Sequence, residues 1–189
     1  MQTKYEQLQD LKAEMLSRDV TPQLARQATQ LVMGHGSLDA EIVFIGEAPG
    51  KKEDETGIPF QGAAGKRLDE LLAAAQLTRD DVYITNIVKY RPPDNRDPKP
   101  DEKQESWPYL ERELAIINPK VIMTLGRHSM SHFMPDAVIG DVHGTIQQVQ
   151  VNGTDYTVAP LYHPAAAIYN RALRQTQEDD FLRVVDAIK

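Results

Sequence analysis

The feature that most constrains the fold is a series of short apolar runs separated by helical patterns. Three of these runs are EIVFIG at residues 41–46, DVYITNIVKY at 81–90 and PKVIMTLG at 119–126. Runs that are apolar on both faces are typical of strands buried inside a parallel sheet. Because helical patterns lie between them, we predict an α/β fold: a three-layer α/β/α sandwich with a central four-stranded, mostly parallel sheet.

Apolar residues that recur every three or four positions predict helices at residues 5–16, 21–32, 65–76, 104–117, 127–133 and 178–188. The dipeptide Asn152-Gly153, between QQVQV and TDYTVAPLY, suits a type I′ turn and predicts a hairpin. The proline-rich stretch at residues 91–102 predicts neither helix nor central strand.

The composition is typical of a globular protein, with 189 residues, 41% of them hydrophobic and 26% charged. We predict one domain over residues 1–189, of which residues 1–36 form an N-terminal helical cap. No apolar run approaches the roughly 20 residues that span a bilayer, and the polar N-terminus does not resemble a secretory signal. We therefore expect a cytoplasmic protein with no membrane partner.

Two further counts restrict the function. The chain has no cysteine, which excludes disulfides, thiolate metal ligands, a cysteine nucleophile and a cysteine-held iron–sulfur cluster. The formal net charge of −7 argues against a non-specific coat for polyanions, although a local basic patch on an acidic protein can still bind phosphate. Nucleic acid therefore stays open as a partner.

Ligands of open α/β sheets bind beyond the carboxyl ends of the strands, so the residues after each apolar run are the candidate site. Four clusters stand there: GEAPG, TNIVKYR, LGRHS and HPAAA. The glycine-rich loop at residues 46–66 suits close approach to a phosphate or a base. It is not a Walker loop, because GAAGK lacks the first glycine at the required spacing and a Ser or Thr after its lysine.

The motifs GEAPG, TGIPFQGAAG, VYITNIVKYRPP, PKVIMTLG, DVHG and YHPAA occur in this order. The chain resembles the uracil-DNA glycosylase superfamily, most nearly its family 4, over about residues 31–188. The resemblance implies a monofunctional DNA N-glycosylase of base-excision repair, which removes uracil after flipping the nucleotide into a pocket. Its partner would be uracil-containing DNA, single- or double-stranded, and we expect a monomer.

The resemblance also implies the roles of site residues. His163 would donate a hydrogen bond to uracil O2, where the charge of the leaving group develops, and Glu47 would position water or stabilise positive charge at C1′. Asn86 would read the uracil edge, since an amide both donates to O4 and accepts from N3–H, and Phe60 would stack on the base. The remaining residues expected around the substrate are Gly46, Ala48 and Gly50. We expect no metal and no other cofactor.

Each of these side chains has a simpler alternative role. His163 could merely cap its strand, Asn86 could satisfy turn backbone, and Phe60 could anchor the loop in the core. Ala48 and Gly50 stand where other branches of the superfamily carry a water-activating aspartate and a tyrosine that blocks thymine. Simple solvation is the alternative for both loop carboxylates, Glu47 and Glu53, and it is the more natural expectation for Glu53.

DNA contacts are expected from residues around the predicted mouth: Lys66, Arg67, Lys89, Arg91 and His143, with Lys51, Lys52 and Arg96 nearby. Each of the basic residues could equally be a solvated surface charge. Ala167 takes the place of the family's leucine wedge, followed by Ile168 and Tyr169. A weaker wedge predicts a preference for single-stranded DNA.

One departure from family 4 is conspicuous. Its four cluster cysteines correspond here to Asp19, Pro22, Tyr90 and Ser106, so no such cluster can form. We hypothesise that Tyr90 and Trp107 pack against the N-terminal helices in its place. The missing cysteines and the acidity leave a second function open, a uracil or single-stranded-DNA binding module or an interaction protein of the same fold. A nucleotide-binding protein is disfavoured by the absent phosphate-loop motif.

Overall fold

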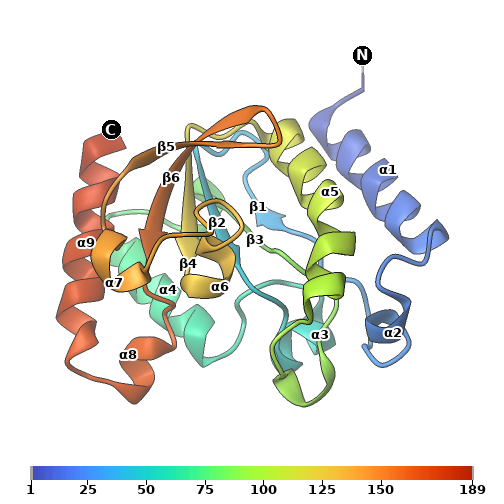
Figure 1. Ribbon diagram of the computed structural model, residues 1–189, viewed down its shortest axis with the longest axis horizontal. Coiled ribbons are helices and arrows are strands. Elements are labelled where there is room, and N and C mark those ends of the chain that lie inside the picture. The colour runs from blue at the N-terminus through green and yellow to red at the C-terminus, as the bar shows by residue number, and fades with distance from the viewer. Residues whose placement is uncertain (1, 189) are drawn as a thin grey trace.

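The computed structural model describes residues 2–188, and within them one six-stranded sheet forms the centre of the protein (Figure 1). The strands are β1 (His35–Gly36), β2 (Ile42–Gly46), β3 (Tyr83–Asn86), β4 (Val121–Leu125), β5 (Gln147–Val151) and β6 (Thr154–Leu161). They lie in the order β1-β3-β2-β4-β6-β5. The strands β3, β2, β4 and β6 are parallel, whereas β1 and β5 pair antiparallel with β3 and β6.

The α/β class and the mostly parallel sheet are confirmed, but the predicted count of four strands is wrong. The four parallel strands are all present, and an antiparallel strand extends the sheet at each edge. One of these is the two-residue β1, and the other is the first strand of the predicted hairpin. Asn152 and Gly153 connect that hairpin with φ values of 51° and 82°, as a type I′ turn requires.

Helices cover both faces of the sheet, which confirms the three layers (Figure 1). One face carries α1 (Lys4–Ser17) and α5 (Pro100–Ile117), and the other carries α4 (Ala63–Ala74) and α9 (Leu173–Ile188). The strand β2 shows how its residues divide: Val43 and Ile45 pack on the α1 and α5 side, Ile42 and Phe44 on the α4 and α9 side. Fully apolar strands are the consequence of burying both faces.

Several helix boundaries differ from the sequence pattern. The short helices are α2 (Pro22–Ala25), α3 (Lys51–Thr56), α6 (Arg127–Met130), α7 (Ile139–Val142) and α8 (Ala166–Tyr169). The helix α5 begins at Pro100, inside the stretch expected to be irregular, because proline at the first helical position needs no N–H partner. The glycine-rich loop also contains α3, which the sequence analysis did not predict.

A buried charge pair holds the end of β3. The side chains of Lys89 and Glu113 are both fully buried and form an ion pair. The Lys89 ammonium also donates to Thr85 Oγ1 at 2.5 Å and to the Asn86 carbonyl at 2.8 Å. Burial lowers the pKa of Lys89, and Glu113 opposes this shift. The predicted DNA contact of Lys89 is therefore wrong, since its three donors all point into the protein.

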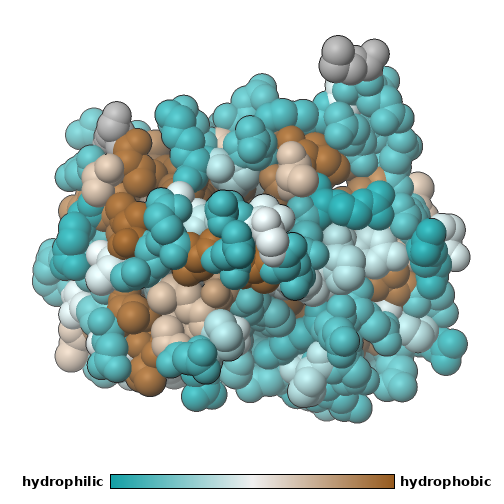
Figure 2. Space-filling view, turned by 45° about the horizontal axis from the view of Figure 1, so that its top comes forward, coloured by the Kyte–Doolittle hydropathy of each residue, from teal (hydrophilic) through white to brown (hydrophobic). Residues whose placement is uncertain are grey.

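No helix within residues 2–188 is long and apolar enough to cross a membrane. On the face seen in Figure 2, hydrophilic residues interrupt the hydrophobic patches, and they predominate over α1 at the right.

Candidate active site

A cavity of about 410 Å³ lies beyond the carboxyl ends of the parallel strands, where the loops and short helices gather at the lower edge of Figure 1. Five of the predicted site residues line it: Ala48, Gly50, Phe60, Asn86 and His163. The other lining residues were not predicted as site residues: Glu53, Gly62, Ala63, Ala64, Asn95 and Ala165. Of these, Asn95 comes from the proline-rich stretch, which the sequence analysis treated only as irregular.

Asn86 is the last residue of β3 and is only 3% exposed. A Cβ atom built on Gly46 would lie 2.4 Å from Asn86 Oδ1, so the absence of a side chain at Gly46 makes room for the amide. The Lys89 ammonium donates to the backbone carbonyl of Asn86, and the side chain of Asn86 lines the cavity. Gly46 and Asn86, which were predicted for the same site, are in contact in the structure.

Phe60 lies in the cavity wall in a conformation that non-glycine residues rarely adopt, with a φ of 56°. Its ring centre lies 6.0 Å from that of His163, and the side chain also belongs to the core beneath α4. Both roles considered for Phe60, the stacking surface and the core anchor, are therefore compatible with its position. Arg79 holds this conformation by donating to the carbonyl oxygens of Phe60 and Pro59.

The carboxylates of the glycine-rich loop bind backbone amides. Glu53 Oε1 accepts from the N–H groups of Gln61 and Gly62 at 2.7 and 2.9 Å. Asp54 accepts from the N–H group of Thr29 at 2.8 Å. The expectation that Glu53 is solvated is wrong, because its carboxylate is buried and satisfies a turn that has no other acceptor for these donors.

His163 follows β6 and is held on two sides. The N–H group of Ala165 donates to His163 Nδ1 at 3.1 Å, and a backbone donor there leaves the proton of a neutral ring on Nε2. Burial, and then the electrostatic effect of the nearby His128, lower the pKa of His163 to about 4. Gly126 has a φ of 96°, and a Cβ atom built on it would lie 3.0 Å from His163 Cβ. The end of β4 thus packs directly against this histidine.

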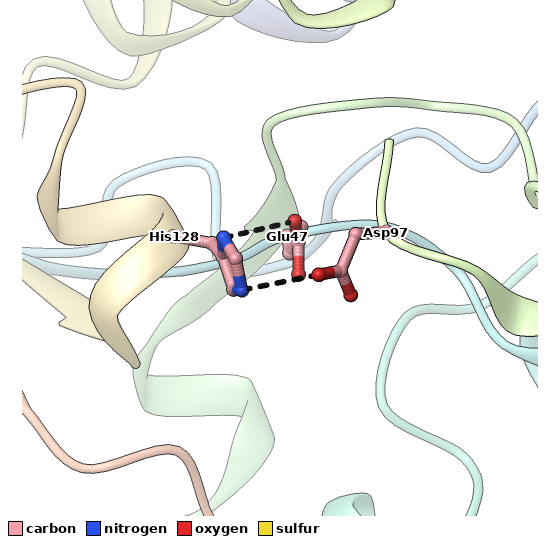
Figure 3. Close-up of side chains that lie close together, drawn as sticks. All are labelled: Glu47, Asp97 and His128. Atoms are coloured by element: carbon pink, nitrogen blue, oxygen red, sulfur yellow. Dashed lines mark ion pairs between the residues drawn. The ribbon is translucent and has the colours of Figure 1, made fainter. Parts of the chain in front are cut away.

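Glu47 is not among the residues that line the cavity. Its carboxylate lies beside His128 of α6 (Figure 3). Lys103 Nζ of α5 lies 3.1 Å from Glu47 Oε1. His128 Nδ1 lies 3.5 Å from the same oxygen, and His128 Nε2 lies 3.5 Å from Asp97 Oδ2. Among the described residues, Glu47 Oε1 has no partner with hydrogen-bond geometry.

The ligand atoms of Glu47, Asp97 and His128 lie within 4.8 Å of one another, a spacing that metal ligands also adopt. Two cations already compensate these groups, since Lys103 pairs with Glu47 and Arg127 Nε donates to His128 Nε2 at 3.3 Å. A divalent ion would have to displace or withstand both of them. We therefore interpret the cluster as an ion-pair network.

Some of the expected DNA-contacting side chains are exposed, and others already form hydrogen bonds or ion pairs within the protein. Lys66 is exposed on α4, and Arg91 is half-buried with Nε donating to Asn95 Oδ1 at 2.7 Å. Arg67 is 6% exposed and donates to Glu70, Gln177 and the Arg174 carbonyl. Its predicted DNA contact is wrong, because Arg67 ties α4 to α9. His143 Nδ1 lies 2.5 Å from Asp180 Oδ2, and its DNA contact stays a prediction.

The segment expected to contain the wedge forms α8. Ala167 is only 6% exposed, so it cannot enter DNA, and its assignment as a DNA contact is wrong. Ile168 and Tyr169 are 45% and 89% exposed. These two side chains project from the segment that follows His163 and Ala165 of the cavity wall.

The positions that correspond to the family's cluster cysteines do not suit an iron–sulfur cluster. They are Asp19, Pro22, Tyr90 and Ser106. Without a thiolate they offer no ligand set for such a cluster. Tyr90 fills the corner as a buried core residue, and its pKa is raised by burial and then by Asp19. Buried Ser106 Oγ has no hydrogen-bond partner among the described residues.

The ring contacts of Trp107 are with residues that follow β4, and its packing against the N-terminal helices stays a prediction. The ring of Trp107 stacks on His132 at 5.0 Å between centres and meets Phe133 edge-on, and both follow β4. Burial, and then the nearby Lys103 and His128, lower the pKa of His132 to about 4. Trp107 thus stabilises the β4 side of α5, while Tyr90 packs in the core that α1 shares.

Comparison with known sequences shows which family the chain belongs to. Residues 33–189 match the family model described as the uracil DNA glycosylase superfamily. The chain is 44% identical to type-4 uracil-DNA glycosylases of Saccharolobus solfataricus and Archaeoglobus fulgidus; each match covers 95% of this chain, and 86% and 92% of those proteins. It is 38% identical to the type-4 uracil-DNA glycosylase of Thermotoga maritima, over 97% of this chain and 96% of that protein. The chain therefore belongs to the uracil DNA glycosylase superfamily and, within it, to the type-4 uracil-DNA glycosylases.

Proposed function

We propose that this protein hydrolyses the N-glycosidic bond between uracil and deoxyribose in DNA and leaves an abasic site. The observation that carries the proposal is the convergence of Asn86, Phe60 and His163 on one cavity. The cavity volume of about 410 Å³ suits a flipped nucleobase, which is read on its edge and stacked against an aromatic side chain. The activity is the one named for the curated relatives.

Asn86 and Phe60 select and hold the base. The amide of Asn86 offers an oxygen to uracil N3–H and an N–H to O4, whereas cytosine presents the opposite donor and acceptor at these positions. A buried amide of this kind rejects the wrong base because its own groups would stay unpaired. Phe60 packs on the base and excludes water from it.

His163 stabilises the leaving group. As the bond breaks, its electron pair moves to uracil N1 and charge spreads onto O2, while a water oxygen adds to C1′ and loses a proton, which the departing uracil anion finally takes up. The Nε2–H group that the Ala165 contact enforces donates to O2. A neutral donor in a partly buried site stabilises this charge without itself carrying one, consistent with the lowered pKa of His163.

Glu47 stabilises the positive charge that develops at C1′ by acting from beside the cavity. It follows Gly46, which touches Asn86 and Phe60, and it precedes Ala48 of the cavity wall. Because Ala48 cannot serve as a base, we assign catalysis chiefly to placement and electrostatics. No iron–sulfur cluster enters the scheme, and we propose that the reaction needs no other cofactor.

The test is release of uracil from a labelled oligonucleotide, followed by alkali and detection of the strand break. The wild type should cleave at uracil, His163→Ala should cleave at least about 100-fold more slowly, and Asn86→Asp should gain activity on cytosine. Binding of the oligonucleotide without any cleavage would refute the enzyme and select the binding module.

We further propose that the protein acts as a cytoplasmic monomer and prefers single-stranded substrate. With Ala167 buried, only Ile168 and Tyr169 of α8 are exposed to enter a base stack. Uracil in a single strand should be released faster than uracil in a duplex. Equal rates on the two substrates would contradict the preference for single strands. A dimer in light scattering would contradict the proposed monomer.

A further inference from the structure

The LGRHS motif after β4 supplies a histidine whose function the proposed chemistry leaves open. His128 is partly buried and lies between two carboxylates, Glu47 from the β2 end and Asp97 from the proline-rich stretch (Figure 3). Its two ring nitrogens face different carboxylates, each at 3.5 Å. The imidazole therefore lies between two loops that are far apart in the sequence.

The position of the His128 ring is itself fixed. It belongs to α6, which starts directly after Gly126, the residue that packs on His163. Arg127 Nε donates to His128 Nε2 at 3.3 Å, which leaves the proton of a neutral ring on Nδ1. That proton faces Glu47.

The proline-rich stretch is rigid enough to contribute to this arrangement. Arg96 donates to both carboxylate oxygens of Glu102, at 2.9 and 2.6 Å, and the N–H group of Lys99 also donates to Glu102. Asp97 lies between these anchored residues. His128 thus lies between Glu47 and a braced segment that also supplies Asn95 to the cavity.

We propose that His128 is a positioning residue whose Nδ1 contact fixes the Glu47 carboxylate in its place beside the cavity. This inference rests on the proposed function, because it assigns His128 an effect only through Glu47. Because Glu47 Oε1 has no hydrogen bond among the described residues, the position of this carboxylate depends on its contacts with Lys103 and His128. Displacement of a catalytic group by about 1 Å can slow a reaction about 100-fold.

The experiment compares His128→Ala, Glu47→Gln and the double variant in single-turnover release of uracil from a single-stranded oligonucleotide. His128→Ala should slow release about 10- to 100-fold, while the Kd for the oligonucleotide stays within about twofold. The double variant should be no slower than Glu47→Gln alone, because the two residues act in sequence. Multiplied effects in the double variant would overturn the proposal.

Two conservative replacements separate this role from a loss of structure. Asn places its amide nitrogen near the position of Nδ1, toward Glu47, whereas Gln places its amide near Nε2, toward Asp97. His128→Asn should recover most of the rate and His128→Gln should behave like His128→Ala. His35→Ala, which removes an exposed histidine of β1, is the matched control and should leave the rate unchanged. Equal behaviour of the Asn and Gln variants would refute a contact to Glu47.

The remaining outcomes are also decisive. A wild type that releases no uracil would refute the proposed function, and the role of His128 with it. An active wild type with multiplicative variants would refute only the role of His128. The rate should be unchanged in EDTA; a loss in EDTA that Mn²⁺ restores would show that the cluster is a metal site and overturn the assignment.

Discussion

Replacing Lys89 by methionine tests whether the buried charge pair supports the base-reading end of β3. Methionine keeps most of the length and volume of the side chain but removes the ammonium. The change removes three donors at once, to Thr85, to the Asn86 carbonyl and to Glu113. It also leaves the Glu113 carboxylate buried without its counter-charge.

The expected magnitude follows from what remains. Glu113 keeps the N–H group of Gly34, the Tyr83 hydroxyl and the Thr85 hydroxyl at 3.0, 2.8 and 3.0 Å, so it stays hydrogen-bonded but uncompensated. Breaking a buried pair on one side costs about 3–5 kcal/mol, whereas a surface lysine costs less than about 0.5 kcal/mol. In a chain of this size, that loss corresponds to a fall in Tm of about 6–20 °C.

Urea denaturation at pH 7 measures the effect, with Glu113→Gln and the double variant completing a cycle. The double variant should be more stable than Lys89→Met, because the orphaned charge is gone, and the coupling should exceed about 2 kcal/mol. Lys66→Met, an exposed lysine on α4, is the control. If Lys89→Met lowers the free energy of unfolding by less than about 0.5 kcal/mol, the reasoning is refuted, because Lys89 then behaves as an exposed lysine.

Three further predictions concern the cavity and its surroundings. The free energy of unfolding should fall as the pH drops from about 6.5 toward 4, because the pKa of His163 is about 4 in the folded state and the unfolded state therefore binds the proton first. The fall should be smaller in His163→Asn. Urea midpoints measured across this pH range test both expectations. Arg79→Lys should slow uracil release about tenfold with little change in DNA binding, because one ammonium cannot replace the guanidinium contacts to Pro59 and Phe60. Tyr90→Ala should cost about 3–5 kcal/mol by calorimetry and Tyr90→Phe much less, because Tyr90 contributes its ring to the core. A urea midpoint that does not change with pH would contradict the first prediction. An unaltered rate in Arg79→Lys would contradict the second, and an unchanged Tm in Tyr90→Ala the third.

The parallel core and the composition of the cavity could be predicted because both depend on local patterns. Strands buried on both faces are continuous apolar runs, and their carboxyl ends meet at one edge of the sheet. This is why Asn86 and His163, which are far apart in the sequence, could be assigned to one site. The edge strand β1 could not be predicted, because a strand of two residues has no periodic pattern of apolar residues.

The direction of a charged side chain could not be predicted. Lys89 and Arg67 sit near the expected mouth in the sequence, as Lys66 does, yet only Lys66 is exposed. What distinguishes them is an acceptor supplied by another element, Glu113 on α5 for Lys89 and Gln177 on α9 for Arg67. Such pairings depend on tertiary contacts, and nothing in the local sequence encodes them.

The loop at residues 46–66 shows what its many glycines and acids are for. Irregular backbone leaves N–H and C=O groups unpaired, and in a buried wall these must find partners. Glu53 supplies acceptors within the loop, Asp54 reaches Thr29, and Arg79 returns from beyond α4 to bind the carbonyls beside Phe60. The loop looks flexible from its composition, but these charged side chains fix it as an ordered wall. A base that enters the cavity therefore meets Phe60 already in place, and its binding does not have to order the loop.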